Sequence, residues 1–252
     1  MKTRGRLAIV AVALLMLGAC ASAAVINVAA DSYVTGYGGS TGTNRSATNY
    51  GADTALKTRF NTGASAWTRK IYLRFDLSSI TAPTIETAVL ELYNTRTTTT
   101  TLKLSVYGLV ESATGYGSGR LDEFWAEGNK NGSAGSAGEI TYANAPGNVS
   151  DIGSNALDSS YVVHLLNYSK SHNLGDTVKL TSQAMIDFLN ADTNNMVTFI
   201  ILYNDTQTTE YSFASKEAST GHAPRLDITT IPEPATMTVL LLGACGALLR
   251  RR

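Results

Sequence analysis

The chain has 252 residues, of which 44% are hydrophobic and 16% charged, and its formal net charge is zero. Between residues 24 and 231 it carries 14 basic and 19 acidic side chains, which argues against a nucleic-acid binder with a broad basic face. Both cysteines, Cys20 and Cys245, lie in apolar terminal runs, so disulfides and cysteine-ligated zinc are excluded from the part between them.

Residues 1–23 are predicted to be a secretory signal peptide. A basic start is followed by the apolar run 7–19, and Ala21 and Ala23 supply the small-residue pattern that signal peptidase cleaves. The alternative is a lipoprotein signal in which Cys20 is acylated. Both interpretations predict export.

Residues 24–230 are predicted to form one all-β domain, an antiparallel sandwich of two sheets with one short helix. Short runs alternate apolar and polar residues between Gly-, Asn-, Ser- and Thr-rich clusters, as in half-buried strands. The predicted helix is 182–190, and the predicted strands are 55–60, 70–76, 87–93, 102–107, 161–165, 197–203, 210–214 and 225–229.

Two loops are predicted from composition. The Thr-rich stretch 94–101 is expected to be a hairpin loop that joins the strands on either side of it. The Gly-, Ser- and Asn-rich stretch 128–138 is expected to be an inserted, flexible solvent loop, with a binding loop as the alternative.

The strands at 55–60 and 70–76 concentrate positive charge. No acidic residue lies between Asp53 and Asp76, yet five of the 14 basic side chains of the domain fall there. If the two strands pair through residues 61–68, strand alternation is expected to place the basic side chains on one outward surface. Those expected on it, with one tyrosine among them, are Lys57, Arg59, Lys70, Tyr72 and Arg74.

This predicted surface is a candidate anion-binding site. Like charges on neighbouring strands repel each other, and a carboxylate ligand would relieve the repulsion because arginine presents a planar fork of donors. The alternative is an ordinary solvated face that Glu86 or Glu91 neutralises.

Catalytic and cofactor signals are weak. No histidine pair has metal-ligand spacing, His164 is expected to be partly buried in a strand, and Asp122, Glu123 and Glu127 are interpreted as surface acids. A polysaccharide lyase would need a basic side chain that neutralises charge and a tyrosine or histidine base, and Arg74, Tyr72 and His222 could supply these. No cofactor is predicted, although calcium is conceivable near Asp31 or Asp53.

A cluster of Trp125, Glu127 and Tyr142 suits the framework of the sandwich better than a sugar-stacking platform.

Residues 231–252 resemble a PEP-CTERM sorting signal. Pro232, Glu233 and Pro234 precede an apolar run of 15 residues, and the chain closes with Arg250, Arg251 and Arg252. The resemblance implies recognition and cleavage by an exosortase-type protease, with transient membrane contact and release to the envelope or extracellular matrix. The alternative is a short transmembrane anchor with cytoplasmic positive charge.

Eight segments in order resemble the DNRLRE-type domain, also classed as carbohydrate-binding module family 96, over nearly all of residues 26–230. They include Arg69-Lys-Ile-Tyr-Leu-Arg-Phe-Asp-Leu77, Trp125-Ala-Glu127 and Ser215-Lys-Glu217. The resemblance implies a non-catalytic, jelly-roll-like sandwich that binds anionic polysaccharide such as alginate through Lys and Arg. By position it assigns binding to Lys57, Arg69, Arg74 and Lys216, and strand geometry adds Arg59, Lys70 and Tyr72. The chain departs from the family in the insertion at 128–138, and in Tyr142, where a tryptophan is usual.

The sequence therefore predicts an exported, non-enzymatic protein that binds uronate-type polysaccharide at or outside the cell envelope. The alternative from another class is a structural or adhesive matrix protein without a glycan ligand, and a polysaccharide lyase is a third possibility.

Overall fold

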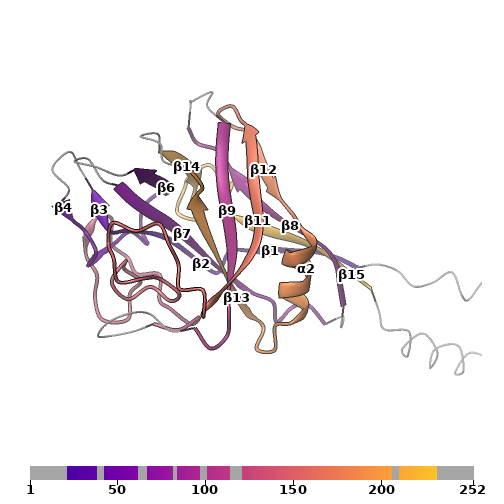
Figure 1. Ribbon diagram of the computed structural model, residues 1–252. Coiled ribbons are helices and arrows are strands. Elements are labelled where there is room, and N and C mark those ends of the chain that lie inside the picture. Colours follow the sequence, from indigo (N-terminus) through magenta and orange to yellow (C-terminus); the bar gives the residue numbers. More distant parts are fainter. Residues whose placement is uncertain are drawn as a thin grey trace, which may run out of the picture.

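The computed structural model describes residues 22–38, 43–61, 67–81, 84–96, 101–113, 121–205 and 210–231. Within these ranges the chain forms two main antiparallel sheets and one short helix, so the predicted all-β sandwich is confirmed (Figure 1). No helix in the described ranges is long and apolar enough to span a membrane. The signal sequence up to Ala21 and the sorting signal from Pro232 onward lie outside the described residues.

The two main sheets differ in size. The smaller has the order β1 (Ser22–Asn27), β15 (Arg225–Ile231), β8 (Thr84–Tyr93), β12 (Thr177–Leu180). The larger has the order β11 (Val162–Ser171), β9 (Thr101–Leu109), β13 (Met196–Tyr203), β7 (Trp67–Asp76), β6 (Ala55–Asn61), β14 (Tyr211–Ala214), and β2 (Ala30–Thr35) also pairs with β7. Two minor ladders join β3 (Tyr37–Gly38) to β4 (Thr43–Asn44) and β5 (Thr48–Asn49) to β10 (Ser133–Ala134).

The main core lies between the two sheets. Because side chains alternate across a strand, Leu73 and Phe75 of β7 and Leu90 and Leu92 of β8 all point inward and are fully buried. Helix α2 (Gln183–Asn190) adds Met185 to this core. The side chain of Ser182 caps the helix by accepting a hydrogen bond from the backbone N–H of Met185, so the predicted helix is confirmed.

A second core covers the outer face of the larger sheet. Tyr72 of β7 and Ile200 of β13 are buried there beneath the long segment 121–157. Trp125 and Tyr142, each 1% exposed, are the largest side chains that this segment contributes. Both rings are therefore framework residues, as predicted, and offer no platform to a sugar.

The predicted hairpin around residues 94–101 is wrong. Strand β8 belongs to the smaller sheet and β9 to the larger, so the connection between them crosses from one sheet to the other. Apolar and polar residues alternate in both strands because each strand has one face on the core. Such a pattern does not identify the partner strand. The described ends of the connection show this separation, since Tyr93 pairs with Thr177 and Thr101 with Ser171.

The stretch 128–138 is more ordered than its composition predicts. Its short strand β10 pairs with β5, and the backbone N–H groups of Gly132 and Gly135 donate to the carbonyls of Asn49 and Ala47. Gly132 has a φ of +86°, a conformation that favours glycine. Most of the stretch is exposed, as predicted for a solvent loop, but its backbone is tied to residues 47–49 by this short ladder.

The two ends of the described domain lie side by side. Strand β1 begins at Ser22, two residues before the predicted mature N-terminus, and Ser22 pairs with Thr230 of β15. Figure 1 shows both strands leading to the same side of the molecule. The predicted cleavage site after Ala23 therefore lies within β1, and the predicted sorting signal begins at the last residue of β15.

Candidate binding site

The register of β6 and β7 decides which basic residues share a face. Arg59 pairs directly with Arg69, and Asn61 pairs with Trp67. Directly opposed residues of an antiparallel pair lie on one face, so Lys70 and Tyr72 belong to the other. The prediction of one surface that holds Lys57 and Arg59 together with Lys70, Tyr72 and Arg74 is wrong, because a shift of one residue in the register moves a side chain to the opposite face.

Two arginines gather around one indole ring. The guanidinium carbon of Arg69 lies 4.2 Å from the centroid of the Trp67 ring, and that of Arg59 lies 4.9 Å from it. Planar guanidinium groups stack on aromatic faces, which fixes their orientation without satisfying all their donors. We call Lys57, Arg59, Trp67 and Arg69 the arginine–tryptophan cluster.

Two of its three cations have acidic partners. Arg69 forms an ion pair with Glu210. The Nζ of Lys57 lies 2.6 Å from Oδ2 of Asp53, and the hydroxyl of Tyr33 donates to the same oxygen over 2.9 Å. The Tyr33 ring also lies 5.7 Å from the Arg69 guanidinium and stacks on another tyrosine ring, which closes one side of the cluster.

Arg59 is the cation of the cluster without a carboxylate partner among the described residues. It has no ion pair with a described residue, and its Nε is buried without a hydrogen-bond partner. Burial, followed by the positive charge of Arg96, lowers the pKa of Arg59. Among the described residues, the ion pairs of the cluster are Lys57 with Asp53 and Arg69 with Glu210. The segments 62–66, 97–100 and 206–209 contain no acidic residue in their sequences.

Lys70 and Tyr72 are buried, contrary to the prediction that they face outward. Both are 0% exposed beneath the segment 121–157. The Nζ of Lys70 donates to the side-chain oxygen of Asn148 and to the carbonyl of Ala156, each over 2.6 Å, and burial lowers its pKa to about 7. The hydroxyl of Tyr72 donates to the carbonyl of Pro146. The alternating pattern of β7 marks two faces, but it does not reveal that a distant segment covers the polar one.

Arg74 and Lys216 are held by local partners. The Arg74 guanidinium donates to the carbonyl of Trp125 and lies 5.2 Å from that ring. The Nζ of Lys216 lies 2.7 Å from a carboxylate oxygen of Glu127 and 2.9 Å from one of Glu217. The structure does not bring these two cations into the arginine–tryptophan cluster.

Several acidic residues are more deeply placed than the sequence predicts. Glu123 is 3% exposed, and burial raises its pKa. Burial also raises the pKa of Glu127 to about 7 and that of Asp31 to about 8. The prediction that Glu123 and Glu127 are ordinary surface acids is wrong, because the segment that carries them folds onto the larger sheet.

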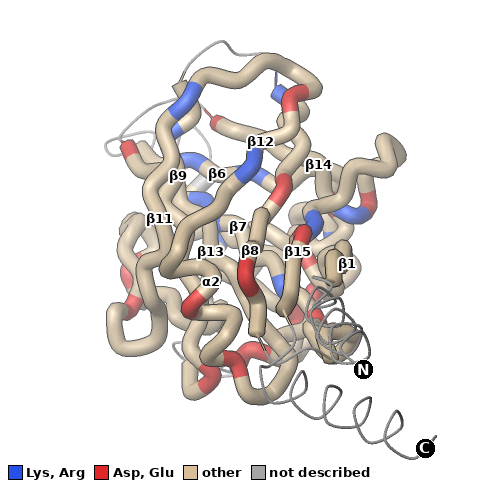
Figure 2. The backbone as a smooth tube through the Cα atoms, turned by 90° about the vertical axis from the view of Figure 1, so that its right-hand side faces the viewer, with Lys and Arg blue, Asp and Glu red and all other residues tan. Residues whose placement is uncertain are grey.

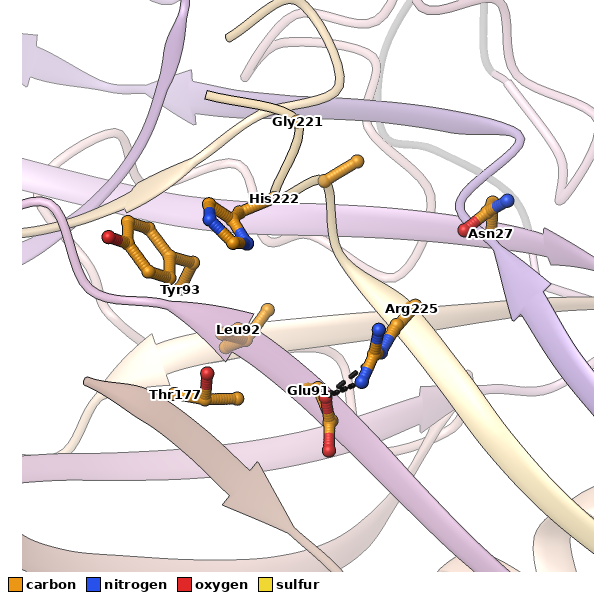
Figure 3. A pocket seen from close by; sticks show the side chains of 9 residues that line it. Asn27, Glu91, Leu92, Tyr93, Thr177, Gly221, His222 and Arg225 are labelled. Atoms are coloured by element: carbon orange, nitrogen blue, oxygen red, sulfur yellow. Dashed lines mark hydrogen bonds and ion pairs between the residues drawn. The ribbon is translucent and has the colours of Figure 1, made fainter. Parts of the chain in front are cut away.

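A pocket of about 270 Å³ lies on the outer face of the smaller sheet (Figure 3). In Figure 3 the rings of His222 and Tyr93 lie parallel, with centroids 4.1 Å apart, and Arg225 points toward Glu91. Lys179 of β12 also pairs with Glu91, so that basic positions on β12 and β15 flank acidic β8 (Figure 2). Glu91 therefore neutralises its own sheet and not the strands β6 and β7.

The candidate lyase residues Tyr72 and His222 are not brought together. Tyr72 is enclosed in the second core, whereas His222 is exposed and lies on the outer face of the other sheet. His164, expected to be partly buried, is exposed and stacks edge-on against Tyr107. The sequence did not indicate the pocket around Glu91, because its lining comes from strands and loops that are distant in the chain.

Comparison with known protein families identifies a class of protein for the first part of the described domain. Residues 22–115 match the profile of carbohydrate-binding module family 96, so the resemblance predicted from the sequence is confirmed over this part of the chain. The matched part contains the whole arginine–tryptophan cluster, whereas Lys216 lies beyond it. No curated protein matches the chain.

Proposed function

We propose that the protein is a non-catalytic binding protein for anionic, uronate-type polysaccharide, and that the arginine–tryptophan cluster is its binding site. The observation that carries the proposal is the state of Arg59. This residue lies opposite Arg69, shares the Trp67 ring with it, and has no acidic partner among the described residues. The family match supports carbohydrate as the ligand class.

The chemistry of the cluster suits a carboxylate better than a neutral sugar. A guanidinium donates two parallel hydrogen bonds to a carboxylate, and charge-assisted bonds of this kind are stronger than neutral ones. A carboxylate placed beside Arg59 would also relieve its repulsion with Arg69 and Arg96. Stacking on Trp67 holds the guanidinium planes in place, so less rotational freedom is lost when a ligand binds.

The test is affinity electrophoresis of the full-length chain, kept in mild detergent because both of its ends are apolar. The gels contain alginate, polygalacturonate or a neutral glucan, at low and moderate salt. We expect retardation by the uronate polymers alone, and weaker retardation as salt rises, because ions screen exposed charges. Arg59→Gln, which breaks no acidic pair within the described ranges, should remove most of the retardation.

A charge-matched control separates a specific site from general attraction. The cluster variant is the double substitution Arg59→Gln with Arg69→Gln. The control is the double substitution Lys130→Gln with Lys179→Gln, which removes the same number of charges from a loop and from the smaller sheet. It should be retarded like the unmodified chain, and so should Lys216→Met. Equal loss in both double variants would contradict the cluster as the site. No retardation by any polymer would favour a structural matrix protein, and new unsaturated uronate ends would indicate a lyase.

We infer further that the protein is exported and then sorted by an exosortase-type protease. The basic and apolar start with Ala21 and Ala23, and the Pro-Glu-Pro motif followed by an apolar run and three arginines, support this inference.

Intact mass of the protein recovered from its producing cells tests this inference. Export and sorting predict a chain that begins near Ala24 and ends near Pro232-Glu233-Pro234. A chain that keeps the terminal arginines would contradict sorting, and a diacylated Cys20 at the N-terminus would show the lipoprotein alternative.

A further inference from the structure

Three carboxylates from distant parts of the chain meet at one end of β2. Asp31 belongs to β2, Glu127 follows the buried Trp125, and Glu217 lies in the turn after β14. Each offers an oxygen atom, and these three atoms lie within 4.8 Å of one another. Two oxygens bound at about 2.4 Å to one calcium ion are at most about 4.8 Å apart, so the spacing admits a shared ion. We call these residues the acidic triad.

Each member of the triad has one buried oxygen without a partner. Asp31 is 1% exposed, and its Oδ1 accepts no hydrogen bond, although its Oδ2 accepts one from the backbone N–H of Lys216 over 2.8 Å. Oε1 of Glu127 and Oε2 of Glu217 are likewise buried and unpartnered. Buried carboxylate oxygens are strongly unfavourable unless donors or cations satisfy them. A cation at this point would satisfy all three carboxylates at once.

Lys216 does not supply the missing charge. Its ammonium contacts Oε2 of Glu127 and Oε1 of Glu217, which are the oxygens opposite the unpartnered ones. One ammonium against three ionised carboxylates leaves two negative charges. Arg74, another cation near Glu127, is engaged by the carbonyl and ring of Trp125. A divalent ion bound by the three ionised carboxylates would balance the two charges.

The surrounding hydrogen bonds hold the triad in place. The side-chain amide of Asn49 donates to the carbonyl of Glu127 over 2.7 Å. The hydroxyl of Ser215 donates to the carbonyl of Asp53 over 2.7 Å and accepts from the N–H of Glu217. These bonds tie the Glu127 segment to β5 and the turn after β14 to Asp53. The N–H of Lys216 ties the same turn to Asp31 of β2. The three carboxylates are therefore held in position by hydrogen bonds of the protein itself.

We propose that the acidic triad binds one divalent cation, with calcium preferred, and that the ion ties β2 to the Glu127 segment and to the turn after β14. Calcium prefers oxygen ligands and accepts irregular geometry, whereas magnesium demands a near-ideal octahedron. Carboxylates from one strand, one irregular segment and one turn suit calcium. The proposal does not depend on the polysaccharide ligand.

The test is calorimetric titration of calcium chloride into the full-length chain after removal of divalent ions, together with thermal unfolding in calcium and in chelator. We expect one calcium per chain, a higher Tm in calcium and weaker binding of magnesium. Asp31→Asn and Glu217→Gln keep the shape of each side chain and remove its charge, and each should weaken calcium binding at least tenfold. Glu86→Gln, on an exposed position of β8, is the matched control and should bind as the unmodified chain does.

Two results would overturn the proposal. The first is absence of heat and of any Tm shift when calcium is added to the unmodified chain, which would mean that Lys216 alone serves the triad. The second is calcium binding that is undiminished in both Asp31→Asn and Glu217→Gln. Glu217 lies in a turn and is half-buried, so its variant keeps the test informative even if Asp31→Asn folds poorly.

Discussion

Arg59 and Arg69 lie directly opposite each other on β6 and β7, and both guanidinium groups rest over the single indole ring of Trp67. Like charges in directly opposed positions destabilise a sheet. Glu210 compensates Arg69, whereas Arg59 forms no ion pair with a described residue and lies near the positive charge of Arg96. The pair is therefore costly to the free protein and suited to an incoming carboxylate.

Trp67→Ala is expected to weaken binding to uronate polymers without removing any charge. Without the ring, the ligand itself must order both arginine side chains, which costs about 0.5–1.5 kcal/mol each, so affinity should fall roughly tenfold. Affinity electrophoresis over a range of polymer concentrations measures this change. Trp67→Phe keeps an aromatic face, so its affinity should lie between those of the unmodified chain and Trp67→Ala. Unchanged retardation of Trp67→Ala would show that the ring does not organise the arginines.

Glu210→Gln is expected to strengthen binding. The Glu210 carboxylate occupies Arg69 in the free protein and competes with a ligand carboxylate for the same donors. Its removal should increase affinity for uronate polymers several-fold at low salt and should lower thermal stability slightly, because an ion pair is lost. Asp205→Asn removes a carboxylate paired with Lys103 instead and serves as its control. Weaker binding by Glu210→Gln alone would indicate that the ion pair positions Arg69.

Because of Lys70, the free energy of unfolding is expected to rise as the pH becomes alkaline. Burial lowers its pKa from 10.5 to about 7, so between these values the unfolded chain binds more protons than the folded one. The free energy of unfolding therefore rises with pH from about 7 to about 10.5, by at most about 1.4 kcal/mol per pH unit from this group. Lys70→Met should lack this contribution.

Urea denaturation at pH 7 and at pH 9.5 measures the dependence. The free energy of unfolding of the unmodified chain, minus that of Lys70→Met, should be larger at the higher pH. Other titrating groups cancel in this difference. A difference that stays constant between the two pH values would mean that the Lys70 ammonium keeps its proton in the folded state.

Asn49→Ala is expected to release the stretch 128–138. The Asn49 side chain is fully buried, donates to the carbonyls of Glu127 and Ile140, and accepts from the N–H groups of Gly51 and Lys130. Its loss leaves buried backbone groups unpaired and should lower the free energy of unfolding by about 3 kcal/mol. Trypsin should then cut faster after Lys130, whereas the exposed Asn129→Ala should leave both properties unchanged.

Local pattern was sufficient for most of the fold. Alternation predicted the strands around Ile71, Val89 and Leu104, and Ser182 with its apolar residues at helical spacing predicted α2. Strand pairing was not predictable in the same way, since β8 and β9 each alternate but belong to different sheets. β2 was missed because all six of its residues are buried, which leaves no alternation to detect.

The candidate site was likewise predictable only in part from the sequence. Composition alone placed an excess of cations between Asp53 and Asp76, because charge can be counted along the chain. Only the tertiary structure decided that Arg59 meets Arg69, that Lys70 is enclosed, and that Asp31, Glu127 and Glu217 converge. These outcomes depend on a register and on a covering segment, and both are fixed by contacts between residues far apart in the sequence.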